Sequence, residues 1–299
     1  MVLFALSACS FACTSRADNK IQSPNILFIF IDDMGYADLG CYGNNDVHTP
    51  NIDQLATEGI RLEQFYVNAP ICSPSRVAVT TGQYPSRWGI TTYISGRSHN
   101  EERGIRNHLD IKAPSVARQL QQNGYYTAHI GKWHMGGGRD INDVPLITEY
   151  GFDESVTQFE GLGERYLATY ETLNRKDSTR SLEKRSAALG FGPVHWAKRE
   201  NFTRIFVDRT IDAIENARKA EKPFYINLWP DDIHTPLEPP QDFPNTPPAG
   251  QYRHPEHLSR GVDSAGRTTT MQQDPVRLPS KKRMYRPGTR QLLTISFFS

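Results

Sequence analysis

Residues that could bind a cation, bind an anion or act as a nucleophile occur in four separate segments of this 299-residue chain. Each segment follows a short apolar run or begins a predicted helix, and in open α/β sheets ligands bind beyond the carboxyl ends of the strands. They are Asp32-Asp33, Cys72-Ser73-Pro74-Ser75-Arg76, Gly131-Lys132-Trp133-His134 and Asp231-Asp232-Ile233-His234.

Asp32 and Asp33 end an apolar run, residues 24–31, whose length and Ile and Phe content predict a strand buried on both faces, as in a parallel sheet. Two adjacent carboxylates repel each other unless a cation is supplied, and oxygen ligands favour a hard ion such as calcium. The alternative is that both residues only cap a turn before Gly35.

Cys72 precedes a predicted helix that begins between Ser73 and Thr80. A helix N-terminus favours an anion, because its exposed N–H groups and its dipole point there. Arg76 lies one turn further along. Without other signals, Pro and Ser after a cysteine also make an ordinary turn, and Arg76 could be a solvated surface residue.

Lys132 and His134 follow the apolar segment 125–130, and a period of two predicts that their side chains share one face of an extended chain. A cation beside an imidazole can bind an anion and move a proton near neutral pH. His129 fits no such pattern, and we interpret it as a structural histidine. The glycines of residues 136–138 indicate a flexible turn.

The pentapeptide 72–76, continued by Thr80-Thr81-Gly82, resembles the signature of the type I sulfatases, and the resemblance runs from about Pro24 to Glu238. In that family a formylglycine-generating or sulfatase-maturing enzyme oxidises the cysteine to formylglycine. The hydrated aldehyde offers two hydroxyls on one carbon: one attacks sulfur and the other later expels sulfate.

The resemblance also implies a role for each candidate residue. It implies that calcium is bound by Asp32, Asp33 and the modified Cys72. It places Arg76, Lys132 and His134 around the sulfate and the nucleophile, and His234 beside the leaving alcohol. Asp231 and Asp232 could tune His234, line the substrate pocket or be solvated.

The implied fold is α/β and alkaline-phosphatase-like, with a central, largely parallel sheet flanked by helices and incomplete at the C-terminus. Five further elements are predicted. They are a helix over 49–59 with a stripe of Ile52, Leu55 and Ala56, an extended segment 61–67, a helix over 116–123, a helix through Val207, Ile211 and Ile214, and a strand from 223 to 229 that follows this helix. Residues 139–201 show no clear periodicity and are interpreted as a long excursion, in which 192–196 forms a packed loop or an aromatic platform for a sugar.

The predicted domains are an export signal or lipoprotein leader with a linker (1–22), the N-terminal part of a sulfatase catalytic domain (23–251) and an atypical basic tail (252–299). The tail has nine Lys and Arg against three Asp and Glu and no clear periodicity, and no Asp-Asn-Gly follows His234. A frameshift near Gln251 would explain this, and a natural basic tail is the alternative. We therefore expect the chain as given to be incomplete and inactive, with an open sheet edge.

The N-terminus and the composition indicate location and partners. Leu6-Ser7-Ala8-Cys9 resembles a bacterial lipoprotein cleavage box, although the short apolar stretch also permits a late start or a chance match. We expect export to the periplasm or cell surface, with membrane contact only through a lipid on Cys9. The formal net charge of +1 argues against nucleic-acid binding, and no apolar run is long enough to span a bilayer.

The predicted function is hydrolysis of a sulfate monoester of a carbohydrate or an aryl alcohol. The alternatives are a phosphomonoesterase or phosphonate hydrolase of the same superfamily, and an inactive surface protein that binds sulfated glycans.

Overall fold

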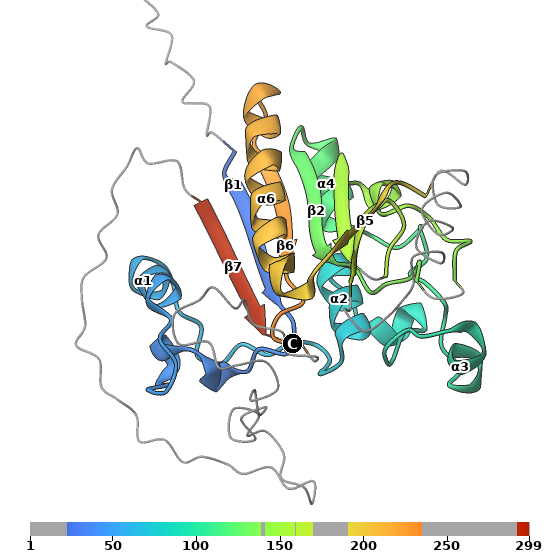
Figure 1. The fold of residues 1–299 in the computed structure, drawn as a ribbon, viewed down its shortest axis with the longest axis horizontal. Helices are drawn as coiled ribbons and strands as arrows, with labels where there is room; N and C mark the ends of the chain where they lie inside the picture. The colour runs from blue at the N-terminus through green and yellow to red at the C-terminus, as the bar shows by residue number, and fades with distance from the viewer. Residues whose placement is uncertain (1–22, 139–140, 159, 170–190, 235–291, 299) are drawn as a thin grey trace, which may run out of the picture.

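A computed structural model describes residues 23–138, 141–158, 160–169, 191–234 and 292–298, the last as backbone only. Within these residues, seven strands form one sheet with the order β5-β4-β3-β2-β6-β1-β7, and every neighbouring pair is parallel (Figure 1). The strands are β1 (Asn25–Ile31), β2 (Tyr126–Lys132), β3 (Glu154–Gln158), β4 (Glu164–Ala168), β5 (Val194–Ala197), β6 (Phe224–Trp229) and β7 (Leu292–Phe298).

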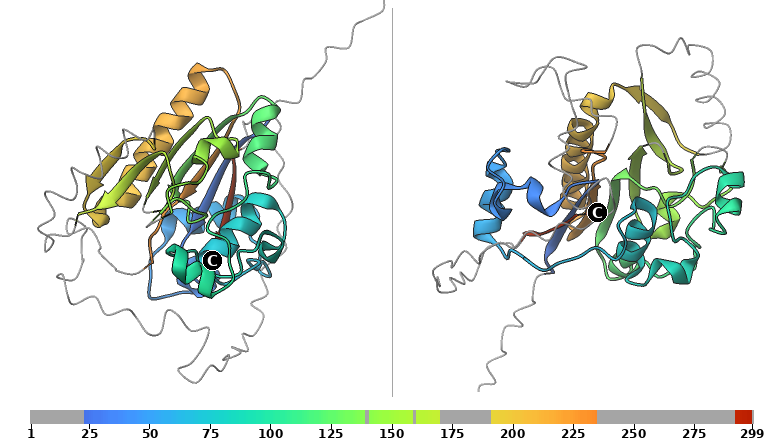
Figure 2. Two further views of the ribbon diagram at one scale, coloured as in Figure 1. Left: turned by 90° about the vertical axis from the view of Figure 1, so that its right-hand side faces the viewer. Right: turned by 90° about the horizontal axis from the view of Figure 1, so that it is seen from below.

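Helices cover both faces of the sheet (Figure 2): α2 (Cys72–Thr81) and α4 (Val116–Gln122) lie on one face and α6 (Phe202–Lys219) on the other. Two further helices, α1 (Pro50–Glu58) and α3 (Arg97–Glu102), lie to the side of the sheet. In β6 successive side chains alternate between the faces: Tyr225 and Trp229 join the core under α2 and α4, whereas Ile226 and Leu228 join the core under α6. The doubly buried parallel sheet predicted from the run before Asp32 is therefore confirmed.

Helix α6 forms where predicted, but of the three apolar residues that located it only Ile214 packs against the core. Val207 and Ile211 are exposed. The helix is turned by about one residue, so that Phe206, Thr210 and Ala213 face the sheet. A phenylalanine removes more apolar area from water than a valine does, and alanine lets the helix approach the strands closely.

Helix α1 also forms, but none of its residues is buried and Leu55 is 46% exposed. Within the described part of the chain, the predicted apolar stripe of α1 is thus only partly shielded from solvent. Residues 61–67 form no strand, contrary to the expected extended segment. No described helix is long and apolar enough to cross a membrane.

Four strands, β3, β4, β5 and β7, were not predicted. β3, β4 and β5 have only four or five residues each and mix polar with apolar side chains, so they give too little periodicity to be recognised. Residues 194–197 form the strand β5 and not the predicted packed loop, and the ring of His195 stacks on Tyr166 at 4.8 Å. The aromatic platform for a sugar stays a prediction.

Strand β7 lies beside β1 over its whole length, from Asn25 opposite Leu292 to Ile31 opposite Phe298. The edge of β1 is therefore paired, and within the described residues the sheet ends at β7 instead, so the expected open sheet edge stays a prediction. The leader with Cys9, the charged stretch 175–180 and residues 252–291 lie outside the described residues, and the domain boundaries stay predictions.

Candidate active site

Three neighbouring strands carry the predicted side chains to one edge of the sheet. β2, β6 and β1 are adjacent and parallel, so their carboxyl ends lie together. Lys132 ends β2, Asp231 follows β6 and Asp32 follows β1. The first turn of α2 reaches the same edge, which lies at the lower end of the view in Figure 1. Parallel α/β sheets bind their ligands at this edge.

Asp32 is completely buried and faces two cations. Its Oδ1 lies 3.2 Å from Nη2 of Arg76, and its Oδ2 is bound by Nζ of Lys132. Burial alone would raise the pKa of Asp32, but the charges of Arg76 and Lys132 outweigh burial and hold the pKa below its usual value. Asp32 is therefore an anion inside the protein.

Lys132 is shared between two carboxylates. Its ammonium lies 3.0 Å from Oδ1 of Asp231 as well as against Asp32. Burial lowers the pKa of Lys132, whereas Asp231 and Asp32 raise it, and the net direction is upward. Lys132 therefore carries a full charge at neutral pH.

Arg76 is fully buried and is not the solvated residue of the alternative interpretation. Its guanidinium lies 5.1 Å from the ring centre of Phe30 and 5.5 Å from that of Trp229. Nε lies 3.4 Å from the backbone oxygen of Lys132. Nη1 and Nη2 donate no hydrogen bond to any described residue, because the ion pair with Asp32 lacks hydrogen-bond geometry.

Cys72 is the first residue of α2, as predicted, and is half-buried. Burial raises the pKa of its thiol more than the nearby charge of Lys132 lowers it. A thiol acts as a nucleophile only as its thiolate, which needs a lowered pKa. An unmodified Cys72 is thus poorly suited to nucleophilic attack.

His134 lies near Lys132, but not for the predicted reason. β2 ends at Lys132, and His134 adopts a left-handed conformation with φ of 50°, so the two-residue period does not apply. Its Nε2 lies 3.1 Å from the backbone oxygen of Ile94 and 3.1 Å from Oε2 of Glu160. A carbonyl oxygen only accepts, so Nε2 carries the hydrogen.

Burial, helped by the charge of Lys132, lowers the pKa of His134 to about 3. The ring is therefore neutral at physiological pH. Its Nδ1 keeps a lone pair, is buried and has no hydrogen-bond partner among the described residues. This nitrogen can accept a hydrogen bond.

Asp33 and His234 form the more exposed side of the cluster. Oδ2 of Asp33 lies 3.9 Å from Nε2 of His234, and the Asp33 side chain is 55% exposed. Burial and the charge of Asp32 raise the pKa of Asp33. His234 follows β6 as predicted, and its backbone oxygen accepts a hydrogen bond of 2.8 Å from Arg199.

Asp32, Asp231 and His234 each offer one ligand atom, and these atoms lie within 4.8 Å of one another. Asp231 was not among the metal ligands predicted from the sequence, which were Asp32, Asp33 and Cys72. Oδ1 of Asp32 accepts no hydrogen bond from a described residue, so a buried carboxylate oxygen is available to a cation. The donor set is rich in oxygen and fits a hard ion such as calcium.

Four residues near the site were missed or left undecided. Asp231 pairs with Lys132 and, at 2.5 Å, with Arg199, so it is buried rather than solvated. Its place directly after a buried strand was the available signal. Arg199 and Glu160 stand next to the unrecognised strands β5 and β3, and no local pattern marks them. Asp232 instead bonds to Thr203.

His129 lies in the core, as predicted. It is enclosed by the rings of Trp133, Phe152 and Trp229 at 5.0–5.5 Å. Burial lowers the pKa of His129 to about 3, so it is a neutral core residue.

A family model described as Sulfatase matches residues 24–277 of the chain. The chain belongs to the sulfatase family. A curated relative, N-acetylgalactosamine-6-sulfatase of Canis lupus familiaris, is 31% identical over 258 residues, which cover 85% of the chain and 47% of the relative. Human arylsulfatase D is 46% identical over 135 residues, which cover 45% of the chain and 22% of the relative.

Solved structures agree with this family membership. Ps i-CgsB in complex with k-i-k-neocarrahexaose is 29% identical, with a TM-score of 0.56 over 73% of this chain and 47% of that one. The sulfatase PsFucS1 from Pseudoalteromonas sp. is 27% identical, with a TM-score of 0.50 over 74% of this chain and 46% of that one. The alkaline-phosphatase-like α/β fold is thereby confirmed. This sulfatase-family chain spans about half the length of its first curated relative and of these two structures.

Proposed function

We propose that the protein hydrolyses sulfate monoesters of a carbohydrate or an aryl alcohol, with a formylglycine formed from Cys72 and with calcium. The observation that carries the proposal is the meeting of Cys72, Asp32, Arg76 and Lys132 in one buried cluster of charges. These residues come from three distant segments of the chain, and the family membership gives their arrangement its chemical meaning.

Formylglycine would supply two hydroxyls on one carbon, one to attack sulfur and one to expel sulfate afterwards. Calcium, held by Asp32 and Asp33 with Asp231 as a further neighbour, would supply positive charge at the sulfate. The protein's own side chains must then bind three sulfate oxygens, remove a proton from the nucleophile and protonate the leaving oxygen.

Arg76 and Lys132 provide the positive charge of the protein itself. Nη1 of Arg76 is buried and has no hydrogen-bond or ionic partner among the described residues, so it can donate to an oxyanion while Nη2 keeps its ion pair with Asp32. The ammonium of Lys132 would exchange one of its carboxylates for a sulfate oxygen. Fixed donors in a site from which water is excluded typically each contribute about 10²–10³-fold in rate.

Two histidines serve the nucleophile and the leaving group. Nδ1 of His134 accepts a hydrogen bond from the nucleophilic hydroxyl and orients it, because the ring is neutral and Nε2 is held by Ile94 and Glu160. His234, on the more exposed side, donates a proton to the leaving alkoxide, which would otherwise be a poor leaving group. Arg199 holds the backbone at His234 and so positions its ring.

The test is sulfate release by protein produced together with a sulfatase-maturing enzyme, assayed with calcium against sulfated saccharides and an aryl sulfate. Cys72→Ala should abolish release, whereas Cys41→Ala, at the other described free cysteine, should retain it. If Cys72→Ala keeps more than about 1% of the parental rate, the formylglycine mechanism is wrong.

Export is a further part of the proposal and depends on the apolar residues 1–9, which lie outside the described residues. Cell fractionation tests it, and recovery of the protein in the cytosol alone would contradict it.

A further inference from the structure

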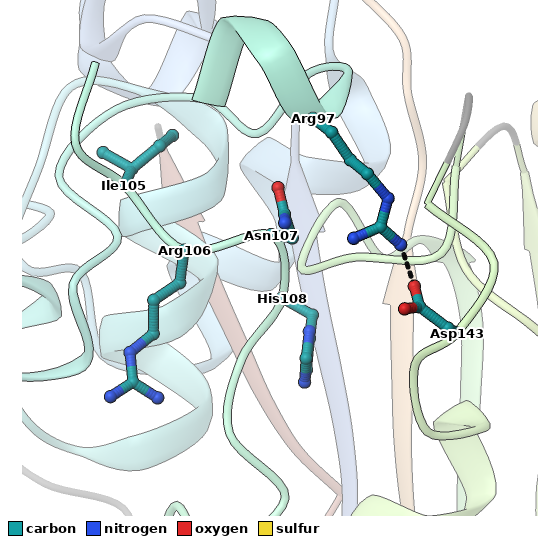
Figure 3. A pocket seen from close by; sticks show the side chains of 6 residues that line it. All are labelled: Arg97, Ile105, Arg106, Asn107, His108 and Asp143. Atoms are coloured by element: carbon teal, nitrogen blue, oxygen red, sulfur yellow. Dashed lines mark hydrogen bonds and ion pairs between the residues drawn. The ribbon is translucent and has the colours of Figure 1, made fainter. Parts of the chain in front are cut away.

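A pocket of about 330 Å³ lies beside the candidate active site, between the start of α3 and the segment that follows residue 104. Its lining is rich in nitrogen donors (Figure 3). The lining residues are Arg97, Ile105, Arg106, Asn107, His108 and Asp143. None of them has a role in the chemistry described above.

The pocket and the active site share a wall. The backbone N–H of Leu109 donates to the oxygen of Met135 at 3.0 Å. A Cβ on Gly136 would lie 2.4 Å from Cβ and 3.0 Å from Cα of His108, so only glycine, here with φ of 117°, allows this approach. The turn at 136–138 is therefore tightly packed, in contrast to the flexible turn that the sequence indicated.

This contact limits the distance between the two sites. Two residues of chain span at most about 7 Å, so the α-carbons of His134 and His108 lie within about 12 Å of each other. The side of the pocket formed by Arg97 is also connected to the active site. The backbone oxygen of Ile94, three residues before Arg97, accepts the hydrogen bond from Nε2 of His134. Because the two sites share this wall, neighbouring units of one saccharide can occupy both.

The charges in the pocket favour an oxyanion. Asp143 is the one carboxylate in its lining, and the guanidinium of Arg97 binds it. Arg106 contacts Asp110 only once, at 3.3 Å, in a pair whose arginine is 58% exposed. Such exposed pairs are weak, so the planar fork of Arg106 remains able to bind a sulfate or carboxylate with two hydrogen bonds.

We propose that this pocket, with Arg106 as its main anchor and His108 beside it, binds an anionic substituent on the sugar next to the one whose sulfate ester is cleaved. The inference rests on the proposed function. It narrows the substrate to a saccharide with at least two anionic groups on neighbouring units. The anion is a sulfate or a carboxylate, since both fit the same guanidinium.

The experiment measures binding by calorimetry with the Cys72→Ala protein, so that no turnover is needed. One pair of probes is neocarrabiose with one sulfate (kappa type) and with a second sulfate on the neighbouring sugar (iota type). The other pair is a monosulfated chondroitin disaccharide with its uronic carboxylate and the same compound with that carboxylate reduced to an alcohol. The first pair reports on sulfate and the second on carboxylate.

We expect the extra anion to tighten binding about tenfold in at least one pair, the usual gain from a hydrogen bond to a charged group. Arg106→Ala should reduce this ratio of Kd values to about one. Arg218→Ala is the matched control, because Arg218 is also exposed and paired with a carboxylate on its own helix, and it should keep the ratio.

Equal binding of both members in both pairs, or binding of neither, would overturn the proposal, as would a preference that persists in Arg106→Ala. Failure of the proposed function gives a different result. In that case the unsubstituted protein, produced with a sulfatase-maturing enzyme, releases no sulfate, while the tighter binding of the probe with the extra anion, which depends on Arg106, remains.

Discussion

Replacing Asp32 by asparagine is expected to destabilise the protein by about 3 kcal/mol at pH 7, although the two side chains have nearly the same shape. The carboxylate of Asp32 is completely buried and compensates Arg76 and Lys132. Lys132 keeps Asp231 at 3.0 Å after the change. Arg76 keeps only two aromatic rings and a backbone oxygen, so most of the cost arises there.

Asp33→Asn is the matched control at the neighbouring position. Asp33 is 55% exposed, its single ionic contact is 3.9 Å long, and burial together with Asp32 already raises its pKa. Asparagine also tolerates the left-handed conformation found at this residue. We therefore expect Asp33→Asn to change stability by less than about 0.5 kcal/mol.

The assay is urea unfolding followed by tryptophan fluorescence, in the presence of a chelator so that metal binding does not contribute. Trp229 lies beside Arg76 and reports on the site. Equal losses in the two variants, or a loss below about 1 kcal/mol in Asp32→Asn, would refute the buried compensation described here.

Two further predictions concern the charged and neutral groups of the site. In a preparation that releases sulfate, Lys132→Ala and His134→Ala should each lower kcat/KM about 10²-fold or more, and neutral behaviour of both would show that their proposed placement at the sulfate is wrong. Stability should fall as the pH drops from about 6.5 towards 3, because the unfolded chain takes up protons on His129 and His134 while the folded protein, in which burial lowers the pKa of each to about 3, does not. Urea midpoints that stay constant between pH 7 and 5 would contradict this.

The parts of the fold that follow from local pattern could be predicted from the sequence. β1 and β6 are long apolar runs, and polar groups at their ends must lie at the carboxyl edge of a parallel sheet. Cys72 was placed correctly because the start of a helix has its own local signal. The convergence of Asp32, Lys132 and His234 follows from these placements.

The rest depends on tertiary context. β3 to β5 are short and mixed in polarity, and only their neighbours in the sheet make them strands. Glu160 and Arg199 reach the site through these strands, so no local pattern marks them. The rotation of α6 is decided by Phe206 packing under the sheet, which outweighs the aliphatic stripe of Val207 and Ile211.

The central claim is that Cys72 is a precursor rather than the nucleophile itself, and peptide mass spectrometry tests it most directly. Trypsin cuts after Arg61 and Arg76 and releases residues 62–76, which contain Cys72 and no other cysteine. In protein made with a maturing enzyme, the peptide should be lighter by about 18 Da than the unmodified form and should react with a hydrazide, which condenses with an aldehyde but not with a thiol. A peptide that keeps its thiol, from a preparation that nevertheless releases sulfate, would contradict the account.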